Sequence, residues 1–437
     1  MKVLFLCNHT NAVHSGGHQR LRHLLKAIAA VGEVTLVYPI APPLTDPDLE
    51  SLRPFCKQMY TFPLSTLAYQ RDPCLPLPLF WAVHKLRYMH PLDSALMQHM
   101  RSAEANALVA DICSQQFDVI WCQRMSSIQM LPPSHGARVI VDLDDLEHRK
   151  LHAQLALWKD PPYMIPLYWF EFFKLKKLER SLRKLPYEFA VCSEMDRKAI
   201  RQDATAWVIP NGVDLPAERG SSEPGETEPI LLFVGLMSYE PNADAALFFA
   251  QRVFPLIQRD VPGAKFLIVG RDPTPPVRQL HDGKSIYVTG TVPDVSDYLL
   301  KSSVVVVPLR FGGGTRIKIL EALAHRKAVV STTIGAEGIE AKPGTHLLLA
   351  DSPEDLARSC TLALKDHSLR NRLGEEGFEL VRDRYQWKGI ERLIGDIVRG
   401  GGLAAPRRLG AGPRVSAQQE AAQEGQRKHR VCDSARG

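Results

Sequence analysis

Residues that could bind an anion lie together in one short stretch of this sequence. The stretch begins with a glycine loop made of Gly312, Gly313, Gly314 and Thr315. It continues with the cations Arg316 and Lys318 and the carboxylate Glu321. Glycines let backbone N–H groups approach an anion closely, and a helix that starts behind them adds the positive end of its dipole. Lys318 and Glu321 are three residues apart, so they share one face of that helix.

This spacing predicts a phosphate site with a carboxylate one turn further in, which suits the diphosphate and ribose of a nucleotide. Arg316 and Lys318 supply full positive charges beside this loop, where they could bind such a diphosphate. The loop alone is equally consistent with a tight turn beside a surface ion pair between Lys318 and Glu321. Neither GxGxxG nor GxxxxGK[ST] is present, so the dinucleotide and P-loop fingerprints do not apply.

The elements that must position this loop follow an α/β pattern that occurs twice. Short, continuous apolar runs are typical of buried parallel strands, and apolar residues at helical spacing lie between them. In the first half, strands are predicted at 2–6, 33–39, 118–122, 138–143, 188–193 and 206–211. In the second half, they are predicted at 229–237, 264–272, 285–292, 304–310 and 327–333. Ligands bind beyond the carboxyl ends of such strands, which is where the glycine loop lies.

This pattern predicts two Rossmann-like, doubly wound domains facing across a cleft. We place the first domain at 1–214, a polar linker at 215–228 and the second domain at 229–385. A C-terminal helix at 386–398 and a disordered tail at 399–437 complete the chain.

Charge and cysteine usage exclude several classes of protein. Eight Lys or Arg and three Asp or Glu lie from Arg399 onward, so this tail carries +5 of the net charge of +6. The rest of the chain lacks the excess of positive charge expected of a nucleic-acid-binding domain. The eight cysteines form no CxxC pair and no zinc spacing, which favours reduced thiols in a cytoplasm. No signal sequence and no run of roughly 18 apolar residues is evident.

Three motifs resemble retaining glycosyltransferases of the large family 4, over roughly residues 1–398. They are "FGGGTRIKILEALAHRKAVVSTTIGAEGI" from residue 311, "VIPNGVD" at 208–214 and "FVGLMSYEPN" at 233–242. The resemblance implies the GT-B fold and is closest to a branch associated with bacterial exopolysaccharide synthesis. Glu321 matches the second Glu of that family's E-x7-E motif, which implies that it binds the donor ribose. Gly313 stands at the position of the first Glu, so backbone amides of the glycine loop would bind the sugar hydroxyls instead. We assign Gly235 to the same donor site.

The first half supplies a second glycine turn, in "HSGGHQR". The resemblance implies that Gly16, Gly17 and Arg20 contact the donor phosphates or the acceptor. Many family members carry a catalytic His after the strand that here ends in Gln123 and Arg124, so no catalytic His is assigned.

Carboxylates gather in "VDLDDL", where we assign Asp142 a catalytic role in orienting an acceptor hydroxyl. Asp142, Asp144 and Asp145 also resemble a DxD metal site, and an Asp here could instead cap the following helix. We expect no metal.

The segment 163–185 contains both aromatic and basic residues and has a net charge of +4. The segment 76–91 has a similar composition. This composition fits a helix lying on an anionic membrane, or a core helix with a solvated basic face. The resemblance implies a cytoplasmic enzyme without a cofactor, located at the inner face of the plasma membrane if the helix binds lipid. It would pass a sugar from a nucleotide-diphosphate donor to a glycan or lipid-linked acceptor. The domain at 1–214 would then lie on the acceptor side, and the domain at 229–385 would bind the nucleotide sugar. Arg316 and Lys318 would act catalytically by stabilising the departing diphosphate. A sugar-nucleotide 2-epimerase and an inactive GT-B protein that binds a glycan or a partner remain alternatives.

Overall fold

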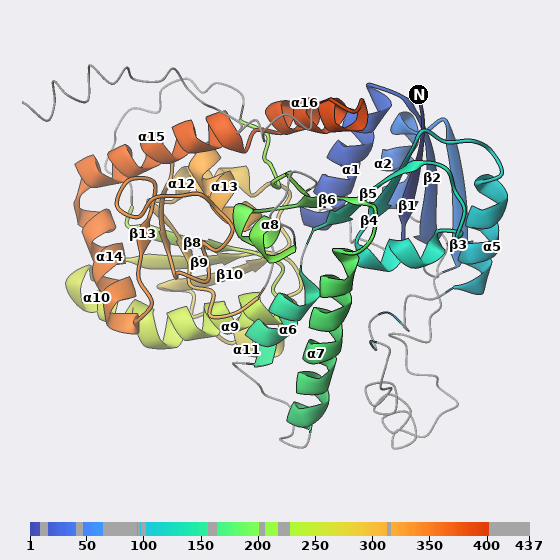
Figure 1. The fold of residues 1–437 in the computed structure, drawn as a ribbon. Coiled ribbons are helices and arrows are strands. Elements are labelled where there is room, and N and C mark those ends of the chain that lie inside the picture. The colour runs from blue at the N-terminus through green and yellow to red at the C-terminus, as the bar shows by residue number, and fades with distance from the viewer. Residues whose placement is uncertain are drawn as a thin grey trace, which may run out of the picture. The chain divides into compact units, whose positions relative to one another are not determined.

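The computed structural model describes residues 1–8, 16–40, 47–63, 94, 97, 102–144, 146–155, 164–200, 206–216, 228–312 and 316–401. Gly313, Gly314, Thr315, Asp145, the segment 76–91 and most of the predicted linker and tail lie outside these residues. Two parallel sheets organise the described part of the chain (Figure 1).

The first sheet contains seven described strands in the order β3-β2-β1-β4-β5-β6-β7, and every neighbouring pair is parallel. The strands are β1 (Lys2–Cys7), β2 (Glu33–Ile40), β3 (Gln58–Pro63), β4 (Val119–Gln123), β5 (Arg138–Leu143), β6 (Glu188–Val191) and β7 (Ala206–Val208). The helices in this half are α1 (Gly16–Ala29), α2 (Pro47–Leu52), α5 (Ala103–Ile112), α6 (Glu147–Leu155), α7 (Ile165–Leu182) and α8 (Glu194–Ile200). Single 3-10 turns lie at Arg53–Phe55 and Met125–Met130.

Both faces of this sheet are covered, which is why its central strands are continuous apolar runs. Leu4 and Leu6 of β1 pack in one cluster with residues of α5 and α7. The opposite face lies under α1, whose side chain Arg20 reaches Asp142 on β5. Successive strand residues point to opposite faces, so Asp142 faces away from the apolar cluster that holds Val141.

The second sheet has six described strands in the order β10-β9-β8-β11-β12-β13, again with parallel pairings throughout. They are β8 (Ile230–Val234), β9 (Lys265–Val269), β10 (Ile286–Gly290), β11 (Val304–Val307), β12 (Ala328–Ser331) and β13 (Leu348–Leu349). Its helices are α9 (Glu240–Phe248), α10 (Phe254–Asp260), α11 (Pro275–Arg278), α12 (Ser296–Lys301), α13 (Ile317–Ala324), α14 (Pro353–Lys365) and α15 (His367–Arg384), with a π-turn at Phe249–Val253.

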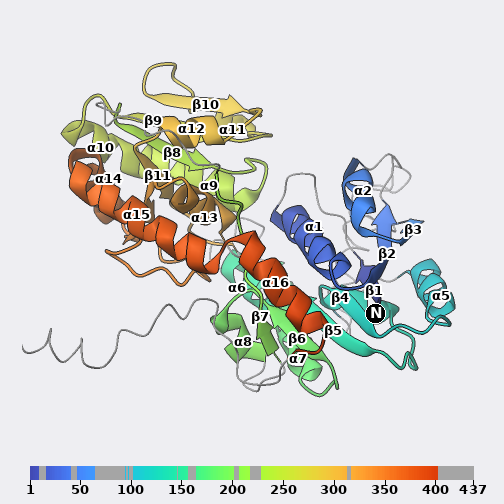
Figure 2. The same cartoon turned by 90° about the horizontal axis from the view of Figure 1, so that it is seen from above.

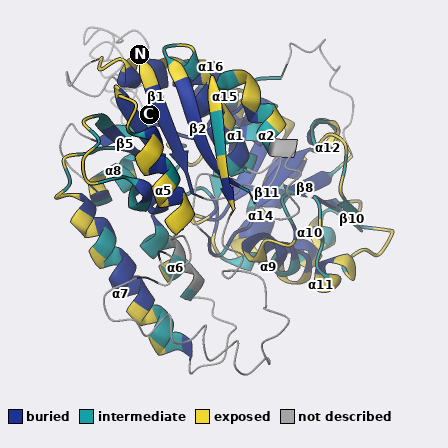
Figure 3. Cartoon of the chain, turned by 90° about the vertical axis from the view of Figure 1, so that its right-hand side faces the viewer, coloured by how far each residue is buried: buried dark blue, intermediate teal, exposed yellow. Residues whose placement is uncertain are grey.

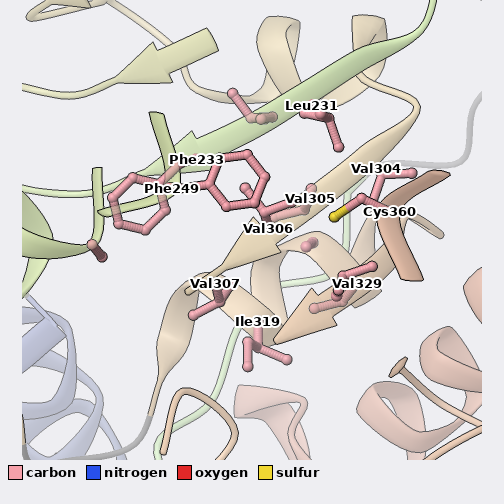
Figure 4. Close-up of a cluster of buried hydrophobic side chains, with 14 of the residues drawn as sticks. Leu231, Phe233, Phe249, Val304, Val305, Val306, Val307, Ile319, Val329 and Cys360 are labelled. Carbon is pink, nitrogen blue, oxygen red and sulfur yellow. The ribbon is translucent and has the colours of Figure 1, made fainter. Parts of the chain in front are cut away.

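The central strand β11 carries the core of this second unit. Its four valines, 304 to 307, are at most 1% exposed and pack with Phe233, Phe249 and Ile319 (Figure 4). This packing fixes the carboxyl end of β11, where Pro308 follows and the predicted ligand loop begins. The strand is shorter than the predicted 304–310.

The prediction of an α/β fold with two Rossmann-like units is confirmed. Every predicted strand is present, β5 with the predicted bounds and the others with shifted ends. Two further strands, β3 and β13, were not predicted. Both lie at sheet edges. Edge position leaves β3 half-exposed and β13 with only two residues, so neither gives a continuous apolar run.

The chain passes between the two halves twice, and the two connecting segments are hydrogen-bonded to each other. The N–H of Val213 donates to the Tyr385 carbonyl at 2.8 Å, and the N–H of Trp387 donates to the Val213 carbonyl at 3.2 Å. Beyond this point α16 (Trp387–Val398) returns to the first half and lies along α1 (Figure 2). Among the helices described, none combines the length and apolar character needed to span a membrane.

Candidate functional site

The start of α13 bears the first group of predicted site residues. Gly312 has a φ of +118°, a conformation that L side chains rarely adopt, so the loop requires glycine at this position. Arg316 stands at the N-cap position and is 6% exposed. Its guanidinium Nη2 donates to the Gly312 carbonyl at 2.8 Å, which folds the cation back over the loop. The predicted strand-loop-helix arrangement is present, and it holds a buried positive charge at a helix N-terminus.

Lys318 is the second residue of α13, two positions after Arg316, and its environment is unlike a protein surface. Its ammonium Nζ donates to Asn242 Oδ1 at 2.6 Å and lies 4.6 Å from the centre of the Phe233 ring. Burial, together with the nearby charge of Arg316, lowers the pKa of Lys318 to about 7. Burial raises the pKa of Glu321 to about 7 as well, against the opposing effect of Lys318.

The alternative of a surface ion pair between Lys318 and Glu321 is therefore wrong. In the described part of the chain, the Lys318 ammonium has an amide oxygen as its partner, and it makes no ion pair with Glu321. A partly buried cation without a paired carboxylate is costly unless another anion is supplied.

Gly235 lies against this cation at the carboxyl end of β8. A Cβ at this position would come within 3.0 Å of the Lys318 Nζ and 2.7 Å of Asn242 Nδ2. The Gly235 carbonyl itself lies where a Cβ on Gly270 would be, only 1.7 Å away. Two glycines thus allow the β8 and β9 ends to approach each other, and they bring bare backbone next to the Lys318 ammonium.

Arg310 is a further cation at this end of the sheet that the sequence reasoning missed. Its guanidinium makes two bonds to Asp244, at 2.6 and 2.9 Å, and lies 4.8 Å from the centre of the Phe248 ring. The side chain remains 39% exposed. Its position immediately before "FGGGT" could have identified Arg310 as a candidate site residue from the sequence.

The second predicted glycine turn meets the first. A Cβ on Gly16 would lie 2.5 Å from Ile317 Cδ1, so the first residues of α1 and α13 are in contact. Two helix N-termini with their partial positive charges consequently lie next to each other, an arrangement that favours an anion. Gly17 lies in the same first turn of α1. The residues 9–15 that precede it are outside the described part.

Arg20 and Asp142, assigned to substrate contact and catalysis, are instead found bonded to each other. Arg20 Nη2 and Asp142 Oδ1 are 2.5 Å apart, and Arg20 Nε donates to Asp142 Oδ2 at 3.0 Å. The remaining guanidinium nitrogen donates to the Ile209 carbonyl and to Asn211 Oδ1. Both side chains are 0% exposed. Burial alone would lower the pKa of Arg20, but the adjoining Asp142 carboxylate raises it overall.

In this geometry Arg20 and Asp142 bind each other inside the protein, and their contact with a substrate stays a prediction. The pair ties α1 to β5 and to the "PNG" segment at 210–212. Asp144 is drawn into the same network, because Asn211 Nδ2 donates to it at 3.3 Å and Arg20 and Arg124 both lie 3.9 Å away. Asp142 and Asp144, two of the three carboxylates that resembled a DxD metal site, thus face arginines. The absence of a metal stays a prediction.

Gln123 ends β4 between Cys7 and Asp142, at the position where the resemblance would have placed a His. It is 0% exposed, and neither its Nε2 nor its Oε1 has a hydrogen-bond partner within the described structure. A buried amide without partners is costly, so Gln123 is a candidate for contact with a hydroxyl or a water. In the sequence, the only indication that this position matters is that many members of the resembling family carry a His there.

Comparisons with known proteins agree with this architecture. Residues 228–366 match the family model described as "Glycosyl transferases group 1". An uncharacterized 44.6 kDa protein in the cps region of Klebsiella pneumoniae is 24% identical over 168 residues, which span 37% of this chain and 43% of that protein.

Solved structures resemble the chain over almost its whole length. Sucrose-phosphate synthase from Thermosynechococcus elongatus has a TM-score of 0.63 at 17% identity, covering 91% of this chain and 98% of that one. Anabaena HepE, in complex with UDP and glucose, has a TM-score of 0.61 at 12% identity, covering 92% of this chain and 100% of that one. The chain therefore has the GT-B fold, and the family match over its second sheet supports a glycosyltransferase.

Proposed function

We propose that this protein transfers a sugar from a nucleotide-diphosphate sugar to a hydroxyl of a glycan or lipid-linked acceptor, with retention of configuration. The observation that carries the proposal is the pair of cations Arg316 and Lys318 at the start of α13, beside the bare backbone of Gly235. We place the reaction in bacterial exopolysaccharide or cell-surface glycan synthesis, as the cps-region relative suggests. The protein would act in the cytoplasm.

The donor end of the proposed site follows from charge and geometry. The diphosphate would lie over the glycine loop, where helix N-termini and Arg316 provide preorganised positive charge. Glu321, one turn further along α13, would accept hydrogen bonds from the ribose hydroxyls once it is ionised. The HepE structure is a complex with UDP and glucose, and a nucleoside diphosphate of this kind is the donor fragment we propose here.

The reaction needs no cofactor and no dedicated protein base in this proposal. The bond between the anomeric carbon and the leaving phosphate oxygen breaks, and the acceptor oxygen bonds to the anomeric carbon. The leaving phosphate takes the acceptor proton, as the resemblance implies. Stabilising the departing diphosphate is then the main electrostatic task, and a preorganised cation of this kind contributes about 10²–10³ in rate.

A lipid-linked acceptor is favoured by three exposed aromatic side chains on one face of α7. Trp169, Phe170 and Phe173 are 38%, 40% and 58% exposed. α7 extends away from both sheets, and Figure 3 shows exposed residues along it. Exposed aromatic rings next to the basic residue Lys177 suit the surface of an anionic membrane. Of the basic residues there, Lys174 is excluded because it is buried against Glu171 at 2.8 Å.

A donor assay distinguishes the proposed transferase from its alternatives. The purified chain should be stabilised thermally by one nucleoside diphosphate among UDP, GDP, CDP and ADP. It should release that nucleotide from the matching sugar donor faster when a glycan or lipid-linked acceptor is added. Conversion of the donor into its 2-epimer without acceptor would show an epimerase. Binding without turnover would favour the inactive protein.

Membrane contact is tested separately with anionic liposomes. We expect Phe173→Ser to weaken flotation with phosphatidylglycerol vesicles, because burying such a side chain contributes about 1.5–3 kcal/mol. Leu362→Ser is the matched control, since Leu362 is a 49% exposed apolar residue on α14. Both variants are made in a chain ending at residue 401, so that the basic tail cannot bind lipid. Equal flotation of the two variants would remove the membrane from the proposal.

A further inference from the structure

The partner of the Lys318 ammonium is a neutral amide held in one orientation. Asn242 lies in α9, is 7% exposed, and its Nδ2 donates to the Leu236 carbonyl at 2.9 Å. This bond assigns the NH₂ group to the Leu236 side, so the oxygen must point at Lys318, which it meets at 2.6 Å. The backbone N–H of Asn242 is fixed as well, by the Tyr239 carbonyl at 2.9 Å.

An amide oxygen orients an ammonium group without neutralising it. A carboxylate at the same place would form a permanent buried ion pair, and an incoming phosphate would then have to compete with it. Asparagine and aspartate have nearly the same shape, so the choice between them is one of charge.

The charges around Lys318 make this choice consequential. From its own helix the ammonium faces Glu321, and from the N-cap it faces Arg316. From α9 it meets only the Asn242 amide, while the nearby Asp244 is bonded to Arg310. From β8 it meets the Phe233 ring and the Gly235 backbone.

We infer that Asn242 is a positioning residue of the donor site: it holds the Lys318 ammonium beside Gly235 and leaves its counter-ion position to the donor diphosphate. The inference rests on the proposed function and deepens it.

It also implies that binding of the diphosphate is coupled to uptake of a proton. Because burial lowers the pKa of Lys318 to about 7, the Lys318 side chain of the free site is largely uncharged at pH 8, and an arriving diphosphate restores its charged form. The diphosphate and about one proton then bind together.

Proton-linked binding has a defined sign. The diphosphate raises the pKa of Lys318, so the complex holds more protons than the free protein above pH 7. Affinity for the nucleoside diphosphate should consequently fall about tenfold per pH unit between pH 7 and 9, relative to a site with fixed charge. Asn242→Asp should pair with Lys318 and keep it protonated, which weakens affinity at pH 7 at least tenfold and flattens this slope.

Isothermal titration of UDP, GDP, CDP and ADP into the full chain tests the inference. Each titration is run at pH 7, 8 and 9 in two buffers with different ionisation enthalpies, which gives the number of protons taken up. Asn242→Ala should weaken binding but keep proton uptake, since Lys318 remains without a carboxylate partner. Asn371→Asp, the same chemical change at an exposed position on α15, should behave as wild type.

The outcomes distinguish a failure of the proposed function from a failure of the role of Asn242. If none of the four nucleotides binds the wild-type chain, the proposed function fails and the inference fails with it. If a nucleotide binds and Asn242→Asp retains the wild-type affinity and pH slope, the proposed function stands and the role of Asn242 is overturned. A loss of melting temperature in both Asn242 variants with unchanged pH slopes would also overturn it, because that pattern belongs to a purely structural residue.

Discussion

Replacing Arg20 by leucine should separate structural support from substrate contact. The substitution removes two bonds to Asp142 and two bonds to the 209–211 segment, and it leaves the Asp142 carboxylate at 0% exposure without its cation. Breaking a buried pair from one side costs about 3–5 kcal/mol. Since domains are stable by only about 5–15 kcal/mol, Arg20→Leu should lose a large share of its free energy of unfolding.

Urea unfolding followed by circular dichroism measures this loss, with nucleotide affinity measured on the same samples. The double variant Arg20→Leu/Asp142→Leu should regain most of the stability, because it leaves no charge buried alone. Arg382→Leu is the control, since Arg382 is 46% exposed in its surface pairs and such pairs contribute about 0–1 kcal/mol. A stable Arg20→Leu protein that no longer binds nucleotide would refute the supporting role and restore the direct contact expected from the sequence.

Three further outcomes are expected. Arg316→Ala should lower kcat/KM about 10²–10³-fold while circular dichroism shows an unchanged fold; near-normal turnover would remove Arg316 from the donor site. Glu321→Gln should be more stable than wild type, because burial raises the pKa of Glu321 from 4.5 to about 7. The stabilising effect of protonating this carboxylate is fully present below pH 4.5 and is lost as pH rises to about 7. The free energies of unfolding of the two proteins, measured with urea, should therefore diverge by about 3 kcal/mol across that window and stay parallel above it. Gln123→Met should gain about 1–3 kcal/mol if the amide is unpartnered in solution as well, and a drop in transfer rate without loss of nucleotide binding would instead place Gln123 against the acceptor.

The features that could be predicted from the sequence are those determined by neighbouring residues in the chain. A run of glycines at a strand end marked the loop before α13, and spacing alone placed Lys318 and Glu321 on one helix face. The alternation of apolar runs and helical periodicity gave both sheets because central parallel strands are buried on both sides. The edge strands β3 and β13 lack that burial and left no such pattern.

Partners far apart in sequence could not be found in this way. Lys318 and Asn242 are separated by 76 residues, and Arg20 and Asp142 by 122. Whether a cation ends in a buried pair or faces a ligand depends on which strands become neighbours in the sheet. The charge of Arg20 was correctly noticed, but only the pairing of α1 with β5 showed that this charge is already neutralised.

The return of α16 to the first half has a consequence for the order in which the protein can fold during synthesis. Arg138, which begins β5, donates to the carbonyls of Ile397 and Val398 at the far end of α16. His23 of α1 stacks on Trp387 at 4.1 Å and bonds to Glu391. A ribosome makes residues 1–216 long before these partners exist, so the outer side of α1 stays uncovered until the last helix emerges. We expect the N-terminal half to reach its final stability only after α16 has emerged from the ribosome, and a nascent chain stalled before residue 387 to depend on chaperones.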